Sequence, residues 1–125
     1  MNKALLFVMA FIAVTTFLNC SSIEENNDPI IGIWYNDNNV SNTNKVLLTT
    51  SKQEWIFNDA YLGRYHKYNN NKISFKTDYR WVEKDGIYTI SYPGTDFSDD
   101  IVTMGNSNGS TILKDQDGNI LAIKE

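Results

Sequence analysis

Residues 30–125 are divided into short apolar-rich segments by frequent Asn, Asp and Gly residues. Within these segments apolar and polar residues often alternate, which is the pattern of a β-strand with one buried face. No long stretch repeats its apolar residues every 3.6 positions, as an amphipathic helix would. The sequence therefore predicts one nearly all-β domain.

The connections between the segments favour a meander of sequential hairpins. Residues 69–71, 84–86, 106–109 and 117–119 are rich in Asn, Asp and Gly, which tolerate the positive φ of tight hairpin turns. So many short strands hide their edges either by closing into a barrel or by splitting into a β-sandwich, and we expect the barrel. The expected strands cover residues 32–35, 45–50, 54–58, 63–68, 72–76, 79–84, 87–92, 101–104, 110–114 and 119–124.

Alternation in the middle of the domain places aromatic residues together on strand faces. Tyr79 and Trp81 share one face of their strand, and Tyr88, Ile90 and Tyr92 share one face of the next. The pattern alone does not say which faces are inside the barrel.

The N-terminus has the composition of a secretion signal. Lys3 supplies one positive charge, and residues 4–18 contain no charged side chain. This apolar run is shorter than the roughly 20 residues that a membrane-spanning helix needs, and it contains Thr15 and Thr16. We expect residues 1–19 to be a signal peptide, and a membrane-spanning helix fits the segment less well.

The only cysteine of the chain, Cys20, lies at the end of this run. The segment Leu18-Asn19-Cys20 resembles a bacterial lipobox, although that motif prefers Gly, Ala or Ser at the position of Asn19. The resemblance implies that Cys20 becomes the lipid-bearing N-terminus of the mature protein, and two or more acyl chains would anchor it stably to a membrane. The alternative, a buried structural cysteine, fits poorly with a position beside a signal peptide.

Residues 20–29 are polar and acidic, and they predict a flexible tether ahead of a domain at residues 30–125. Acidic residues shortly after a lipidated cysteine resemble the signal by which some Gram-negative bacteria place lipoproteins on the cell surface. The resemblance implies the outer face of the outer membrane, and the periplasmic leaflet is the alternative. No cysteine remains for a disulfide within the domain, so its stability must come from its core and backbone hydrogen bonds.

The net charge argues against one class of partner. Removing residues 1–19 removes one lysine and no acidic residue, which changes the formal charge from −4 to −5. An acidic domain with dispersed lysines lacks the one-sided basic surface that phosphate backbones require. We therefore expect no nucleic-acid partner.

The triplet Gly32-Ile33-Trp34 opens the first expected strand and resembles the Gly-x-Trp signature of lipocalins. Together with the signal, lipobox, tether and β-meander, it makes the chain similar to the small bacterial lipocalin-like lipoproteins. The resemblance implies that Trp34 plugs the closed end of an up-and-down barrel and that a basic side chain packs across it. The candidates for that basic side chain are Arg64, Arg80 and Lys124.

A lipocalin-like barrel further implies a cavity for a small, largely apolar ligand. Aromatic residues on strands either line such a cavity or fill the core, and the sequence leaves both roles open. The candidate lining residues are Trp55, Phe57, Tyr65, Trp81, Tyr88 and Tyr92.

Signals for catalysis and metal binding are weak. The one histidine, His66, has no nucleophile at a motif spacing, and Asp96, Asp99 and Asp100 lie in a loop that we expect to be solvated. Residues 115–119 resemble a fragment of a calcium loop without its distal carboxylate, and we favour a hairpin turn there. We expect no enzyme activity, no cofactor and no metal.

Three functions can be distinguished by structure. A lipocalin-like binding module needs an apolar cavity of roughly 300 Å³ or more, open at one end. A structural or protein-interaction lipoprotein, whose partner the sequence does not name, would have a filled interior and an exposed aromatic patch. An enzyme needs converging polar groups with shifted pKa values in a cleft. The sequence favours the binding module.

Overall fold

The computed structural model describes residues 24–39 and 50–125. The expected signal peptide (1–19), Cys20 and all but the last residue of the strand expected at 45–50 lie outside these ranges. Among the described residues, no helix has the length and apolar character needed to cross a membrane.

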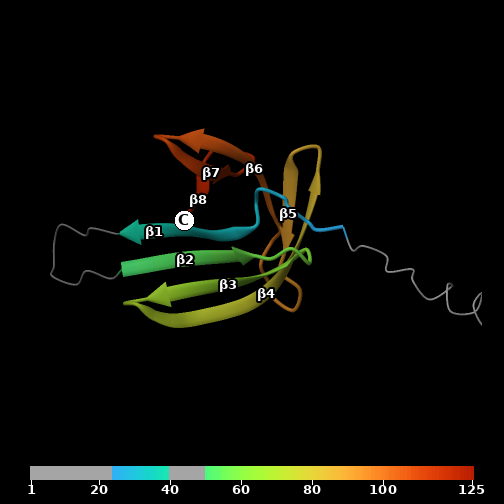
Figure 1. The fold of residues 1–125 in the computed structure, drawn as a ribbon. Helices are drawn as coiled ribbons and strands as arrows, with labels where there is room; N and C mark the ends of the chain where they lie inside the picture. The colour runs from blue at the N-terminus through green and yellow to red at the C-terminus, as the bar shows by residue number, and fades with distance from the viewer. Residues whose placement is uncertain (1–23, 40–49) are drawn as a thin grey trace, which may run out of the picture.

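The described part of the chain forms eight antiparallel strands that close into one barrel (Figure 1). Each strand pairs with the next along the chain, and the last strand returns to pair with the first. The all-β meander and its closure are confirmed, and the β-sandwich alternative is wrong. The strands are β1 (Gly32–Asn39), β2 (Thr50–Phe57), β3 (Leu62–Asn69), β4 (Lys72–Lys84), β5 (Ile87–Ser91), β6 (Asp100–Ser107), β7 (Ser110–Lys114) and β8 (Ile120–Lys124).

The expected hairpin turns join these strands. Three of them place two consecutive residues at positive φ, as type I′ turns require, and the pairs are Asn70–Asn71, Asp85–Gly86 and Asn108–Gly109. In the β7–β8 turn, Asp115 Oδ1 accepts hydrogen bonds from the backbone N–H groups of Asp117 (2.9 Å) and Asn119 (2.8 Å). The residues that resemble a calcium-loop fragment therefore form this hairpin turn.

Two expected strands, 72–76 and 79–84, are one continuous strand, β4. The residues between them do not turn, because β-branched Thr77 favours extended chain and Asp78 accepts a hydrogen bond from Arg64 Nε on β3 (2.8 Å). The first part of β4 pairs with β3, and the part from Arg80 onward pairs with β5. One strand of 13 residues thus serves both neighbours.

Both strand faces that the sequence left unassigned point into the barrel. Tyr79 and Trp81 on β4 are 1% exposed, and Tyr88, Ile90 and Tyr92 are at most 6% exposed. They join a single core with Ile30, Trp34, Trp55, Phe57, Tyr65, Val102, Leu113 and Ala122.

The barrel is plugged at the end where β1 begins. Trp34 is fully buried, and its Nε1 donates a hydrogen bond to the backbone oxygen of Ile30 (2.7 Å). Lys124 packs across it, with Nζ 5.4 Å from the ring centroid, and donates to the backbone oxygen of Pro29 (2.5 Å). Of the three candidate basic residues, Lys124 is therefore the one that covers Trp34; Arg64 pairs with Asp78 on the outer surface, and Arg80 is exposed.

The segment before β1 completes this closed end. Asp28 Oδ1 accepts hydrogen bonds from the hydroxyl of Tyr88 (2.8 Å) and the backbone N–H of Ile30 (2.9 Å). Ile30 itself is fully buried. Asp28 and Pro29, which the sequence analysis assigned to the tether, thus contact the barrel, and Figure 1 shows the chain entering β1 at the end opposite the β3–β4 hairpin.

A close approach of ring to backbone makes Gly63 necessary on β3. Gly63 pairs with Tyr79 on β4, and the Tyr79 ring lies over the glycine backbone. A Cβ added at Gly63 would lie 2.1 Å from Cζ of that ring. The core therefore has no room for any side chain at this position.

Gly63→Ala is expected to destabilise the barrel by about 1–3 kcal/mol, because the Tyr79 ring must leave its place in the core. Urea denaturation measures the change. Gly105→Ala is the matched control, because its new Cβ would lie 3.5 Å from the flexible Cε of Lys114 and is expected to cost less than about 0.5 kcal/mol. Equal losses in the two variants would contradict this account of Gly63.

Candidate functional site

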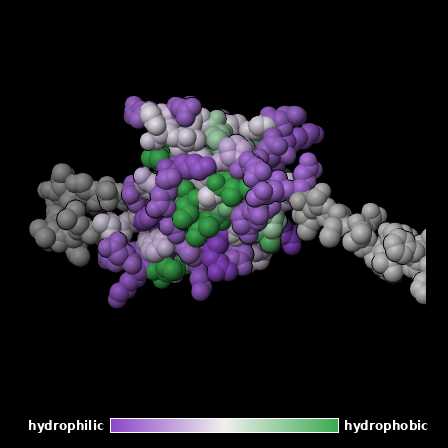
Figure 2. Space-filling model, viewed as in Figure 1, coloured by the Kyte–Doolittle hydropathy of each residue, from purple (hydrophilic) through white to green (hydrophobic). Residues whose placement is uncertain are grey.

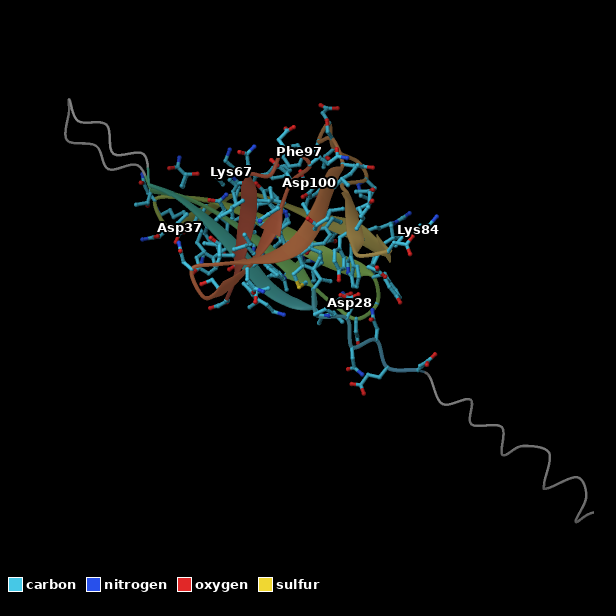
Figure 3. The ribbon with its side chains drawn as sticks, turned by 90° about the horizontal axis from the view of Figure 1, so that it is seen from above. Asp28, Asp37, Lys67, Lys84, Phe97 and Asp100 are labelled. Carbon is cyan, nitrogen blue, oxygen red and sulfur yellow. The ribbon has the colours of Figure 1, made fainter. Side chains whose placement is uncertain are left out.

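The open end of the barrel holds a pocket of about 320 Å³. Its position is clear from β5, because Tyr88 near the start of the strand bonds to Asp28 at the closed end, whereas Tyr92 just after the strand lines the pocket. Figure 3 shows Phe97 and Asp100 together on the opposite side of the barrel from Asp28. The lining residues are Gln53, Trp55, Tyr65, Tyr92, Phe97, Ser98, Asp100 and Leu121.

Four aromatic rings form the walls of this pocket. Trp55 and Tyr65 are cross-strand neighbours on β2 and β3, with ring centroids 5.2 Å apart. Phe97, in the connection between β5 and β6, packs edge-on against Tyr92 (5.5 Å) and Tyr65 (6.0 Å). Because Phe97 is 45% exposed, it forms the outer wall of the pocket.

A chain of hydrogen bonds fixes the polar groups of the pocket. Trp55 Nε1 donates to the hydroxyl oxygen of Tyr92 (2.8 Å), and the Tyr92 hydroxyl donates to Asp100 Oδ2 (2.6 Å). On the neighbouring wall, the Tyr65 hydroxyl donates to Gln53 Oε1 (3.1 Å). The rings are therefore held in place by directed bonds as well as by packing.

Burial shifts the pKa values of Tyr92 and Asp100, the last two residues in this series of hydrogen bonds. Burial raises the pKa of Asp100 above its usual range, and nearby Asp99 and Asp115 raise it further, while the hydrogen bond from Tyr92 acts in the opposite direction. Burial and the neighbouring Asp100 also raise the pKa of Tyr92 far above its usual value. Tyr92 therefore stays a neutral donor to Asp100 at neutral pH.

The six aromatic residues singled out in the sequence fall into two groups. Trp55, Tyr65 and Tyr92 line the pocket. The other three are packed in the filled half of the barrel, where Trp81 lies 5.9 Å from Phe57 and 6.2 Å from Tyr88 between ring centroids. These three residues belong to the hydrophobic core and do not line the pocket.

Sequence reasoning missed Phe97 and Asp100. Asp100 was expected in a solvated loop, but it is partly buried as the first residue of β6, so that expectation is wrong. Alternation could have found it, since Asp100 and buried Val102 are two positions apart and share a strand face. Phe97 had no such signal, because its place depends on the path of the β5–β6 connection.

The other candidate chemical groups lie outside the pocket. His66 Nδ1 is 3.1 Å from Glu54 Oε1, and the Tyr68 hydroxyl donates to the same oxygen (3.2 Å). Asp96 and Asp99 are exposed. Within residues 24–39 and 50–125, no three His, Cys, Asp or Glu side chains come together in a group that could hold a metal ion.

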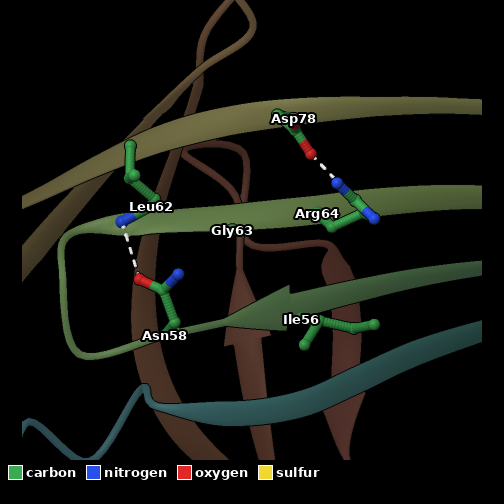
Figure 4. A pocket seen from close by; sticks show the side chains of 6 residues that line it. All are labelled: Ile56, Asn58, Leu62, Gly63, Arg64 and Asp78. Carbon is green, nitrogen blue, oxygen red and sulfur yellow. Dashed lines mark hydrogen bonds and ion pairs between the residues drawn. The ribbon is translucent and has the colours of Figure 1, made fainter.

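A second, larger hollow of about 470 Å³ lies against β2, β3 and β4 (Figure 4). Its charged groups, Arg64 and Asp78, are paired with each other at 2.8 Å and are 57% and 72% exposed. Asn58 Oδ1 accepts a hydrogen bond from the backbone N–H of Leu62 (3.1 Å). This hollow is an open surface groove whose two charged side chains are exposed and paired with each other, so it is the weaker candidate.

Comparison with known proteins adds no family to this description: no family model matches the chain, and neither the curated proteins nor the solved structures searched contain a match.

Removing the Tyr92 hydroxyl is expected to destabilise the domain by about 1–3 kcal/mol, because Tyr92→Phe leaves Trp55 Nε1 buried without an acceptor. Thermal and urea denaturation measure the change. Tyr79→Phe is the matched control: the buried Tyr79 hydroxyl has no hydrogen-bond partner among the described residues, so its removal is expected to be neutral or stabilising. A Tyr92→Phe variant as stable as Tyr79→Phe would contradict the role of the hydrogen-bond chain.

Proposed function

We propose that this chain is a membrane-anchored, lipocalin-like lipoprotein that binds a small, largely apolar ligand at the open end of its barrel without catalysing a reaction. The observation that carries the proposal is the pocket of about 320 Å³ with four aromatic walls. Its volume lies at the lower end of the range for ligand pockets in proteins. The eight-stranded closed barrel is compatible with this mode of binding.

The filled half of the barrel limits where the ligand lies and how large it is. Below the pocket, Phe57, Trp81 and Tyr88 occupy the interior, and each is at most 5% exposed. Binding deep in the barrel would require these rings to leave the core. The proposed ligand is therefore a small molecule held at the mouth, and a long acyl chain does not fit the interior.

The proposed lipid anchor would place this mouth away from the membrane. The N-terminal segment joins the barrel at the closed end, where Asp28 and Pro29 are bonded to Tyr88 and Lys124. Cys20 lies eight residues before Asp28, a distance of at most about 29 Å when fully extended. This is close to the length of an eight-residue strand, about 27 Å. The mouth would reach the membrane only with the tether fully extended along the barrel, so we expect the pocket to open to the aqueous phase.

The second candidate function is a protein-interaction lipoprotein, and two observations favour it. The closed half of the barrel is solid, and Figure 2 shows apolar side chains gathered over β1 and β2. Ile33 and Ile56 are cross-strand neighbours on these strands, and Ile33 is 38% exposed. The patch at Ile33 and Ile56 is aliphatic, whereas the pocket combines aromatic walls with directed polar groups, so the binding function has more support.

Filling the pocket tests the proposed function. Ser98 is exposed and lines the pocket, so Ser98→Trp is expected to block it without disturbing the core. The full-length chain in neutral detergent is titrated against the uncharged fluorescent probe N-phenyl-1-naphthylamine, and Ser98→Trp is expected to weaken binding at least about tenfold.

Ser110→Trp is the control for this experiment, because Ser110 is exposed at the β6–β7 hairpin on the closed end of the barrel. It adds the same indole far from the pocket and is expected to leave probe binding unchanged. No binding to the unmodified chain, or equal binding to both variants, would refute a ligand site at the mouth.

The proposed anchor is tested at Cys20. Cys20→Ser is expected to abolish incorporation of radiolabelled palmitate when the chain is expressed in a Gram-negative host, because serine cannot form the thioether. Ser21→Ala, one residue further along, is expected to keep full labelling. Labelling of Cys20→Ser at the level of Ser21→Ala would refute lipidation at this cysteine.

A further inference from the structure

We propose that the ligand carries a protonated amine that pairs with Asp100, while its apolar part lies against the aromatic walls of the pocket. This inference rests on the proposed function and names the chemical class of ligand that the same site selects.

The first argument is the hydrogen-bonding capacity of the pocket. The indole N–H of Trp55 and the hydroxyl of Tyr92 already donate to Tyr92 and Asp100, and the hydroxyl of Tyr65 donates to Gln53. These three donors are thus used internally. The described lining groups left without a hydrogen-bond partner are Asp100 Oδ1, the Ser98 hydroxyl and the Gln53 amide nitrogen, and of these only the carboxylate can carry a charge. The strongest group left for a ligand is therefore an acceptor, and it calls for a donor on the ligand.

The second argument is charge. No lysine or arginine is among the described residues that line the pocket, and the ion pairs found in residues 24–39 and 50–125 do not include Asp100. The carboxylates of Asp99 and Asp115 lie close enough to act on Asp100 and add to the negative potential at the mouth. A ligand carboxylate or phosphate would be repelled there, whereas a cation would be attracted.

The third argument is the combination of the carboxylate with aromatic rings. Asp100 lies in one pocket with Trp55, Tyr65, Tyr92 and Phe97. Rings of this kind attract cations through their negative faces, and a partly buried carboxylate binds an ammonium group by a charge-assisted hydrogen bond. The same rings bury the apolar part of a small amine. A pocket of about 320 Å³ thus fits a small aryl or alkyl amine.

Three probes of similar size and different charge test the inference. The full-length chain in neutral detergent is titrated by calorimetry at pH 7 with 2-phenylethylamine, 2-phenylethanol and 3-phenylpropionate. The expected order of affinity is the amine first, the alcohol about tenfold weaker or more, and the acid weakest. An alcohol or acid that binds as tightly as the amine overturns the inference and leaves the proposed function standing. Failure of all three probes to bind also overturns the inference, whereas the proposed function is refuted only by the naphthylamine titration described above.

Asp100→Asn supplies the residue-level test, because the amide keeps the size of the side chain and an oxygen that accepts the Tyr92 hydrogen bond. It is expected to weaken binding of the amine about tenfold or more while changing binding of the alcohol little. Asp99→Asn is the matched control, since it removes the same charge from an exposed neighbour and is expected to have a much smaller effect. Equal effects of the two variants on amine binding would show that the pairing at Asp100 does not exist, and circular dichroism verifies that both fold.

Discussion

The seam between β1 and β8 closes the barrel, and the rest of the structure depends on it. Trp34 and Tyr35 pair with Lys124 and Ile123 in the shortest ladder of the sheet. The backbone N–H of Glu125 and the side-chain amide of Asn36 extend the seam by donating to Ile33 (2.9 Å) and Leu121 (2.8 Å). The described domain contains no cysteine, so no disulfide holds the barrel closed. Pairing at this seam removes the free edges that an open sheet would expose, and the plug around Trp34 packs beside it.

The interior of the closed barrel has two parts, a half filled by core side chains and a half that contains the pocket. Near the plug, Ile30, Trp34, Phe57 and Trp81 fill the barrel and leave no access for a ligand. At the other end the interior holds the pocket beside Asp100, and Phe97 covers the pocket from the side. The solid half supplies stability to a small domain, which leaves the open end available for binding.

The polar groups of the pocket are arranged by the same packing that stabilises the barrel. Tyr92 has most of its ring in the core, yet its hydroxyl joins Trp55 to Asp100. The carboxylate is thereby held in a partly buried position that it would otherwise avoid. Structure and binding are thus coupled at Tyr92, because the residue that anchors the wall also orients the acceptor.

Local patterns in the sequence predicted most of the strands and the turns, and the resemblance to lipocalins implied the plug at Trp34. Alternation predicts that aromatic residues such as Tyr79 and Trp81 share a strand face, Asn, Asp and Gly residues predict the turns, and the Gly32-Ile33-Trp34 triplet marks the first strand. Only the tertiary structure decided that residues 72–84 form one strand, that Lys124 covers Trp34, and that Phe97 and Asp100 complete a pocket. These features depend on contacts between segments that are distant in the chain. Barrel closure and the path of the β5–β6 connection decide those contacts, and local periodicity predicts neither.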